Sequence, residues 1–277
     1  MTLILVWFIV AIAQSIFCQR TWVKHVGFAI ACLILAFGIR GLTVKTYNYL
    51  EQGLFVNTAS GQAMIVANVL YVADREAGEA IQDPELQALF YDMFDQAYEQ
   101  KLNMDFAPKG LIRRAIYHED CHEPLNFDIF SPLGKEYVTA HTGTTIGEYQ
   151  LMMVELDEVA SQLTKAIMPN VLKRYIINYV SVIALGFVRT VAFEHSILNW
   201  YALVVFMLAL VILGLLIRKK REKEAGFLAV VLLLIVGNVT ATSLMIECVS
   251  RYMLYNLPLF YIAALLAVIS IVEKKRG

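Results

Sequence analysis

Residues 118–122, with the sequence HEDCH, match the H-E-x-x-H pattern and form a candidate metal site. On a helix, His118 and His122 would share one face and could bind zinc, while Glu119 would polarise the attacking water. Pro124 disfavours helical geometry in the residue before it, so the helix is predicted to end at the second histidine. A catalytic zinc site, a non-catalytic metal or substrate contact and a solvated polar turn are all open, and the turn is favoured.

A catalytic zinc ion would need a third protein ligand from another part of the chain. Its candidates are Glu136, His141, Glu148 and Glu155, and no recognised spacing selects one of them. A divalent metal is therefore the only cofactor that the residues suggest.

A pair of carboxylates, Asp74 and Glu76, directly follows the apolar run 64–72. Acidic groups just beyond a buried element can hold a sugar or a cation, or act as a general base. The alternative is a solvated helix start with local ion pairs, and that alternative is favoured. The two residues are kept as candidates for substrate binding.

Arg251 lies between the apolar runs 226–245 and 252–272. A charge at the edge of a membrane span is a functional hypothesis by default, and this arginine could contact a lipid-linked phosphate. It could equally extend to the lipid headgroups or pair with Glu247, four residues earlier on a helix. Arg189 and Glu194 carry the same ambiguity.

The composition indicates a membrane protein with a polar insertion. Hydrophobic residues make up 58% of the 277, charged residues 17%, and the mean hydropathy is +0.60. Residues 44–172 hold 8 Lys+Arg and 19 Asp+Glu, which gives 8 − 19 = −11, and the rest of the chain carries +10. The four cysteines are scattered and form no zinc or disulfide framework. No basic patch with interleaved aromatics supports nucleic-acid binding.

Apolar runs that are predicted as membrane spans flank this acidic segment. They cover residues 2–17, 26–39, 198–217, 226–245 and 252–272. The sixth run, 175–193, contains polar residues, and it either spans the membrane, lies at its surface or forms a re-entrant helix. If it spans, the acidic segment is cytoplasmic. If it does not, the segment is extracytoplasmic and all basic loops are inside, which is the favoured arrangement.

The fold class is predicted as mainly α: a polytopic helical membrane protein of five or six spans with an inserted, mostly helical polar domain. Residues 1–43 would form two transmembrane helices, residues 44–172 the acidic domain, and residues 173–277 the remaining helices. Asp83-Pro84 is a strong helix start. The run 64–72 could be a strand or a helix, a loop is expected around Pro124 and Pro132, and a long helix is expected to end at Pro169.

Residues 250–261, SRYMLYNLPLFY, resemble the last spans of multi-spanning glycosyltransferases of the GT-C superfamily. The chain also resembles the C-terminal half of membrane proteins from anaerobic Gram-positive bacteria. The GT-C resemblance implies a bacterial inner-membrane protein that transfers a sugar from a polyprenyl-phosphate donor at the outer face. It carries over Arg251 alone, because the amino-terminal half that usually holds the catalytic acid has no counterpart in this sequence.

Three functions are therefore predicted from the sequence. The leading one is a cell-membrane protein related to lipid-linked-sugar glycosyltransferases of the envelope, or a fragment of one. The enzymatic alternative is a membrane-anchored zinc hydrolase that uses His118, Glu119 and His122. The third is a non-enzymatic protein whose acidic domain binds another envelope protein or cations.

Overall fold

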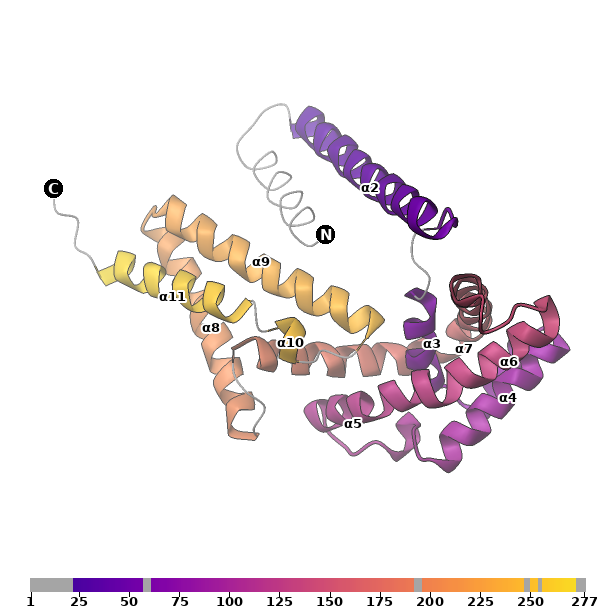
Figure 1. The fold of residues 1–277 in the computed structure, drawn as a ribbon. Coiled ribbons are helices and arrows are strands. Elements are labelled where there is room, and N and C mark those ends of the chain that lie inside the picture. The colour runs from indigo at the N-terminus through magenta and orange to yellow at the C-terminus, as the bar shows by residue number, and fades with distance from the viewer. Residues whose placement is uncertain (1–21, 57–60, 192–195, 247–249, 254–255, 273–277) are drawn as a thin grey trace. The chain divides into compact units, whose positions relative to one another are not determined.

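A computed structural model describes residues 22–56, 61–191, 196–246, 250–253 and 256–272, which contain helices and no strand (Figure 1). The mainly α prediction is confirmed. The helices are α2 (Trp22–Gln52), α3 (Gly61–Val72), η1 (Arg75–Ala80), α4 (Pro84–Glu99), η2 (Met104–Phe106), α5 (Leu111–Glu123), the π-helical η3 (Pro124–Phe130), α6 (Ser131–Thr142), α7 (Tyr149–Val191), α8 (Ser196–Arg218), α9 (Glu222–Met245), α10 (Ser250–Met253) and α11 (Asn256–Val272).

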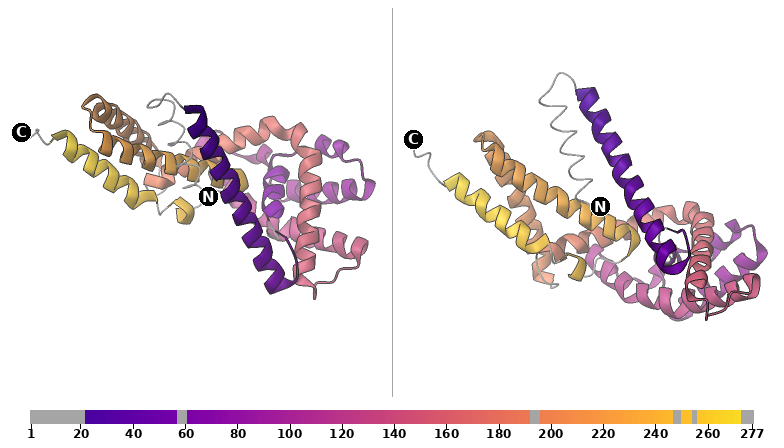
Figure 2. Two further views of the ribbon diagram at one scale, coloured as in Figure 1. Left: turned by 90° about the horizontal axis from the view of Figure 1, so that it is seen from above. Right: turned by 45° about the horizontal axis from the view of Figure 1, so that its top comes forward.

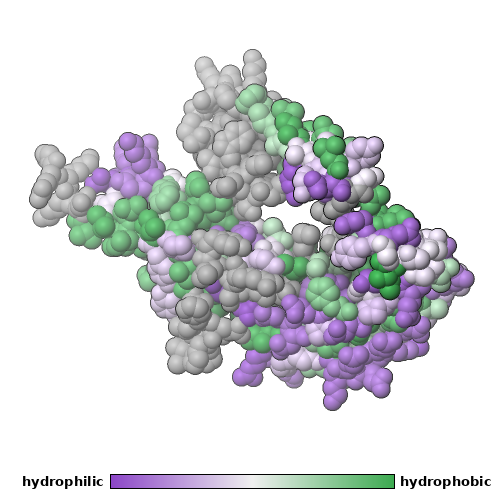
Figure 3. Space-filling view, viewed as in Figure 1, coloured by the Kyte–Doolittle hydropathy of each residue, from purple (hydrophilic) through white to green (hydrophobic). Residues whose placement is uncertain are grey.

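The chain divides into two compact units. One unit, called the helical domain below, contains residues 38–184 and 243–247. The other, called the apolar unit, contains residues 1–37, 185–242 and 248–277 as far as they are described. Figure 3 shows hydrophilic residues over α4, α5 and α6 of the helical domain and hydrophobic residues along α11 of the apolar unit.

Four helices in the described part of the chain are long and apolar enough to cross a membrane: Ile30–Glu51, Tyr149–Val191, Trp200–Arg218 and Glu222–Leu244. The predicted spans 198–217 and 226–245 are thus helices of sufficient length. Helix α11 has 17 residues and falls just short. The run 2–17 lies outside the described residues. Helix α2 is longer than the predicted segment 26–39, since it begins at Trp22 and ends at Gln52.

Helix α3 lies at the centre of the helical domain and packs against α4, α5 and η3 (Figures 1 and 2). Eight of its twelve residues are buried, which settles the ambiguous run 64–72 as a helix. Its hydrophobicity on all sides is typical of a helix inside a protein core. The buried residues of α3 are Ala63, Val66, Ala67, Asn68, Val69, Leu70, Tyr71 and Val72.

Helix α4 begins as the sequence predicts. The Asp83 carboxylate accepts hydrogen bonds from the backbone N–H groups of Glu85 (2.9 Å) and Leu86 (3.3 Å), and Pro84 occupies the first turn. The buried residues of α4 are the predicted apolar face, namely Leu86, Leu89, Phe90, Met93, Phe94 and Ala97. A capped start and a single apolar face therefore determine this helix locally.

The loop predicted around Pro124 and Pro132 is wrong, and so is the helix end at His122. Residues 111–142 are helical throughout, with the π-helical η3 between α5 and α6. Proline lacks an N–H group and its ring clashes with the carbonyl four residues earlier. Between the two prolines the helix widens into π turns, in which the N–H of Ser131 bonds the carbonyl of Asn126, five residues back.

The helix end predicted at Pro169 is also wrong, because α7 continues for 43 residues through that proline. Pro169 and Lys165, whose carbonyl loses its hydrogen bond, both lie on the exposed face of the helix. A carbonyl on an exposed face can bond water, so the proline can be accommodated there by a bend. The N-terminal part of α7 contributes Leu156, Leu163 and Ile167 to the domain core.

Replacing Gly78 with alanine is expected to destabilise the helical domain by about 1–3 kcal/mol, the usual cost of overpacking. An added Cβ atom would lie 2.6 Å from Cδ1 of Phe90 and 2.7 Å from Cε1 of Tyr91. Hydrogen exchange of α4 peptides in the detergent-solubilised chain measures the effect. Gly147→Ala is the control, because its nearest neighbour would be 3.7 Å away. Equal exchange in the two variants would contradict this packing.

Candidate functional site

The HEDCH segment lies on α5, and both histidines face the central helix α3. His118 is 1% exposed, and its Nε2 donates a hydrogen bond to the amide oxygen of Asn68 (2.8 Å). His122 is 2% exposed, and its Nε2 contacts the carbonyl oxygen of Met64 (3.3 Å). The favoured interpretation of this segment as a solvated turn is therefore wrong.

The four-residue spacing of the histidines serves the packing of two helices. Residues i and i+4 share a helix face. His118 contacts Asn68, and His122 contacts Met64, four residues before Asn68. The two helices are therefore antiparallel where they meet. One turn further, the Asn126 amide contacts the sulfur of Met64 (3.1 Å). Polar side chains thus line the contact between α5 and α3 over three turns.

The same contacts bear on metal binding. A ring nitrogen that donates a hydrogen to an oxygen is protonated and has no lone pair for a metal. The Nε2 atoms of both histidines are engaged in this way, so a metal could be bound only through their Nδ1 atoms. Among the residues that the structure describes, no three His, Cys, Asp or Glu side chains lie close enough to hold a metal ion. The predicted set of His118, Glu119 and His122 is not joined by a third ligand there.

The four residues proposed as a third metal ligand do not contact His118 or His122. His141 pairs with Glu85, the Glu155 carboxylate accepts a hydrogen bond from the Thr142 hydroxyl (2.8 Å), and Glu148 bonds Thr145. Glu136 lies on the surface of α6. None of these side chains is brought to the buried histidines.

Two further groups complete the surroundings of His118. The Tyr71 ring meets the His118 ring edge-on, with centroids 4.7 Å apart. Cys121 is buried, and loss of solvation raises the pKa of its thiol to about 12. A thiol with so high a pKa has almost no thiolate at neutral pH and is a poor nucleophile. The cluster is therefore suited to holding helices together.

The predicted carboxylate pair begins the short helix η1. The Asp74 carboxylate accepts a hydrogen bond from the N–H of Ala77 (3.0 Å), and Glu76 is exposed in the first turn. This is the geometry of a helix cap. Arg251 belongs to α10, but its side chain lies outside the described residues, and its role at a lipid phosphate stays a prediction.

Sequence reasoning missed the side chains that close the two ends of α3. At the start, Asp157 of α7 accepts hydrogen bonds from the N–H groups of Gln62 (2.6 Å) and Ala63 (3.2 Å). At the other end, the Asn103 amide donates to the carbonyl of Ala73 (2.8 Å). Asn103 and Asp157 lie 30 and about 95 residues from their partners, so no local pattern could reveal these bonds.

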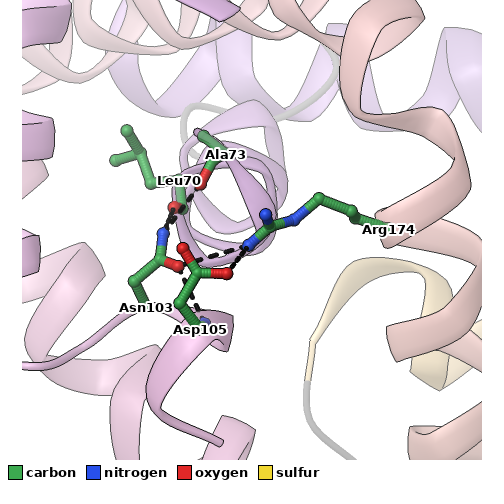
Figure 4. Close-up of polar contacts among 5 residues, drawn as sticks. All are labelled: Leu70, Ala73, Asn103, Asp105 and Arg174. Carbon is green, nitrogen blue, oxygen red and sulfur yellow. Dashed lines mark hydrogen bonds and ion pairs between the residues drawn. The ribbon is translucent and has the colours of Figure 1, made fainter. Parts of the chain in front are cut away.

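Arg174 fastens the Asn103 end, as Figure 4 shows. Its guanidinium donates to the Asp105 carboxylate (2.7 Å) and to the Asn103 side-chain oxygen (3.4 Å). That same oxygen accepts the N–H of Asp105 (3.0 Å). The start of η2, the end of α3 and α7 are thereby joined in one network.

A groove of about 540 Å³ lies on the surface of the helical domain and is called the α6 groove here. It is lined by Pro132, Lys135, Glu136, Thr139, Ala140 and Ile146. Ile146, one of the large apolar side chains exposed on this domain, is 73% exposed at the edge of the groove.

Hydrogen bonds hold the loop that carries Ile146. The Thr139 hydroxyl donates to the carbonyl of Thr144 (2.9 Å), and the Thr145 N–H donates to the Glu148 carboxylate (3.0 Å). Gly143 ends α6 with a left-handed φ of 75°, which glycine adopts without strain. The exposed isoleucine is thus presented by an ordered loop.

No family model, no curated protein and no solved structure matches the chain. The resemblance to GT-C glycosyltransferases stays a prediction from the sequence.

Breaking the contact between Asn68 and His118 is expected to destabilise the helical domain. Asn68→Ala or His118→Ala should each cost about 1–3 kcal/mol, because each leaves a buried polar group without this partner. The double variant should cost less than the sum, as measured by hydrogen exchange of α3 and α5. Asp120→Ala, on the exposed side of α5, is the control. Zinc that copurifies with the chain and is lost from the His118 variant would contradict a purely structural role.

The pKa of His141 is raised above its ordinary 6.5, first by the bond to Glu85 and then by the backbone carbonyl of Tyr137. The protonated histidine therefore favours the fold, fully below pH 6.5, and this contribution is lost as pH rises through the raised pKa. NMR titration should show that Glu85→Gln lowers this pKa. A value at or below 6.5 in the unaltered chain would contradict the pairing.

Proposed function

We propose that this chain is a multi-pass membrane protein whose helical domain binds a segment of another protein. The α6 groove would receive an apolar anchor residue of that segment, and basic residues beside the anchor would face the surrounding carboxylates. The observation that carries this proposal is an ordered apolar groove on a strongly acidic domain. This is the third of the functions predicted from the sequence, with its binding site now specified.

The apolar part of the argument concerns Ile146. Exposing a large aliphatic side chain to water is unfavourable, by about 25 cal/mol for each Å² of apolar surface. Here the exposure is maintained by Thr139, Thr145 and Glu148, whose hydrogen bonds shape the loop. An apolar side chain seated in the groove would remove this surface from water, and an ordered groove loses little conformational entropy on binding.

The electrostatic part of the argument concerns the domain as a whole. Residues 61–173 contain 18 Asp+Glu and 8 Lys+Arg, a balance of 8 − 18 = −10. Glu136 lines the groove together with Lys135, and Glu148 follows Ile146 in the ordered loop. Such a field attracts cationic segments, accelerates their association and repels acidic ones. The partner is therefore expected to be basic next to its apolar anchor.

The membrane setting agrees with this role. Four helices in the described part of the chain have the length and composition of membrane spans, which supports a membrane-attached domain. If the run 175–193 at the end of α7 does not span, as in the favoured topology, the domain is extracytoplasmic and its partner would be another envelope protein. If that run spans, the domain and its partner would be cytoplasmic.

The two enzymatic functions stay predictions. A glycosyltransferase role depends on Arg251 and a polyprenyl-phosphate donor. A zinc hydrolase role would require a further ligand beside His118 and His122, and no group of three possible metal ligands occurs among the described residues.

Site-directed photo-crosslinking in cells tests the proposed function. A benzophenone amino acid at Ala140 should crosslink one partner protein, and the same group at Gln162, outside the groove, should not. Mass spectrometry should find an apolar residue flanked by Lys or Arg at the crosslink. Glu136→Lys should reduce the yield severalfold, whereas Glu76→Lys, the same charge change on η1, should not. Equal yields at Ala140 and Gln162, or an acidic crosslinked peptide, would overturn the proposal.

A further inference from the structure

The apolar unit contains a hollow of about 370 Å³ between α9 and α11, called the α9–α11 hollow here. It is lined by Lys223, Glu224, Phe227, Ala263, Leu266, Ala267, Ile269 and Ser270. Both helices belong to the same compact unit and run alongside each other in Figures 1 and 2.

Small residues on one face of α11 create the space. Ala263, Ala267 and Ser270 follow one another at spacings of four and three, so they share a helix face. Opposite them, Phe227 of α9 is 39% exposed although its ring could pack against a larger neighbour. The result is an apolar slot beside a helix that is long and apolar enough to span a bilayer.

One end of the slot is polar and charged. Lys223 and Glu224 lie there, and the Ser270 hydroxyl donates to the Glu224 carboxylate (3.2 Å). The Lys219 ammonium donates to the carbonyl of Ile271 (3.0 Å), in the last turn of α11. Five of the six residues 218–223 are basic, so positive charge predominates at this end.

We propose that the α9–α11 hollow binds an anionic phospholipid with a hydroxylated headgroup. The phosphate would lie at Lys223, a headgroup hydroxyl would donate to Glu224, and one acyl chain would follow Phe227 and Leu266. Basic pockets between membrane helices are suited to anionic lipid headgroups. The apolar slot selects a lipid over a free phosphate, because a free phosphate would leave that slot without an occupant. This inference does not depend on the proposed function of the helical domain.

Native mass spectrometry of the full chain in a nonionic detergent tests this site. Phosphatidylglycerol should be retained preferentially over phosphatidylcholine, and Lys223→Gln should weaken its retention by about fivefold. Lys173→Gln, which removes an exposed lysine from the helical domain, is the matched control and should change nothing. Ser270→Leu should displace the lipid by filling the slot, whereas Ala264→Leu, outside the lining, should not.

Three results would overturn the proposal. One is equal retention of phosphatidylglycerol and phosphatidylcholine. Another is unchanged retention in Lys223→Gln, a substitution at an exposed position that does not threaten folding. The third is full displacement of the lipid by soluble glycerol phosphate, which would mark a phosphate site with no role for the acyl chain.

Discussion

The helical domain depends on closing both ends of a short buried helix. Helix α3 has twelve residues, too few to be stable alone in water, and its unpaired terminal N–H and C=O groups would be costly in a dry core. Asp157 bonds the N–H groups at its start, where a negative charge also complements the helix dipole. Asn103 bonds the carbonyls at its other end and is held in turn by Arg174. Because Asp157 and Arg174 both belong to α7, one long helix fixes both ends of α3 and so locates the centre around which α4, α5 and η3 pack.

The HEDCH segment illustrates how one spacing can serve two purposes. Histidines four apart on a helix can converge on a metal, but they can equally meet partners four apart on an antiparallel neighbour. Here Asn68 and Met64 are those partners, and His118 and His122 are almost completely buried against them. Buried polar groups need hydrogen-bond partners, and a hydrogen-bonded pair fixes the register of the two helices in a way that apolar contacts alone do not. The chain stays helical past Pro124 in the π-helical η3, so that Asn126 extends the row.

The two proposed recognition sites use apolar surface in different settings. In the α6 groove an isoleucine is held out by a hydrogen-bonded loop on an acidic surface, a combination that favours a basic protein segment. In the α9–α11 hollow, small residues leave a slot beside a candidate span, and the charge next to it is basic, a combination that favours an anionic lipid. The sign of the neighbouring charge thus distinguishes a protein ligand from a lipid one.

Features that depend on neighbouring residues could be predicted from the sequence. Composition predicted helices suited to a membrane, and Asp83 with the spacing from Leu86 to Ala97 predicted α4 together with its buried face. Features that depend on distant partners became visible only in the folded chain. Pro124 and Pro169 were expected to end helices, yet the chain stays helical past both: η3, which follows Pro124, packs against α3, and Pro169 lies on an exposed face of α7. Likewise, the sequence predicted His118 as a solvated or metal-binding residue, whereas in the structure it is bonded to Asn68, fifty residues earlier. Caps and periodicity act within one or two turns, whereas burial is decided by which elements meet.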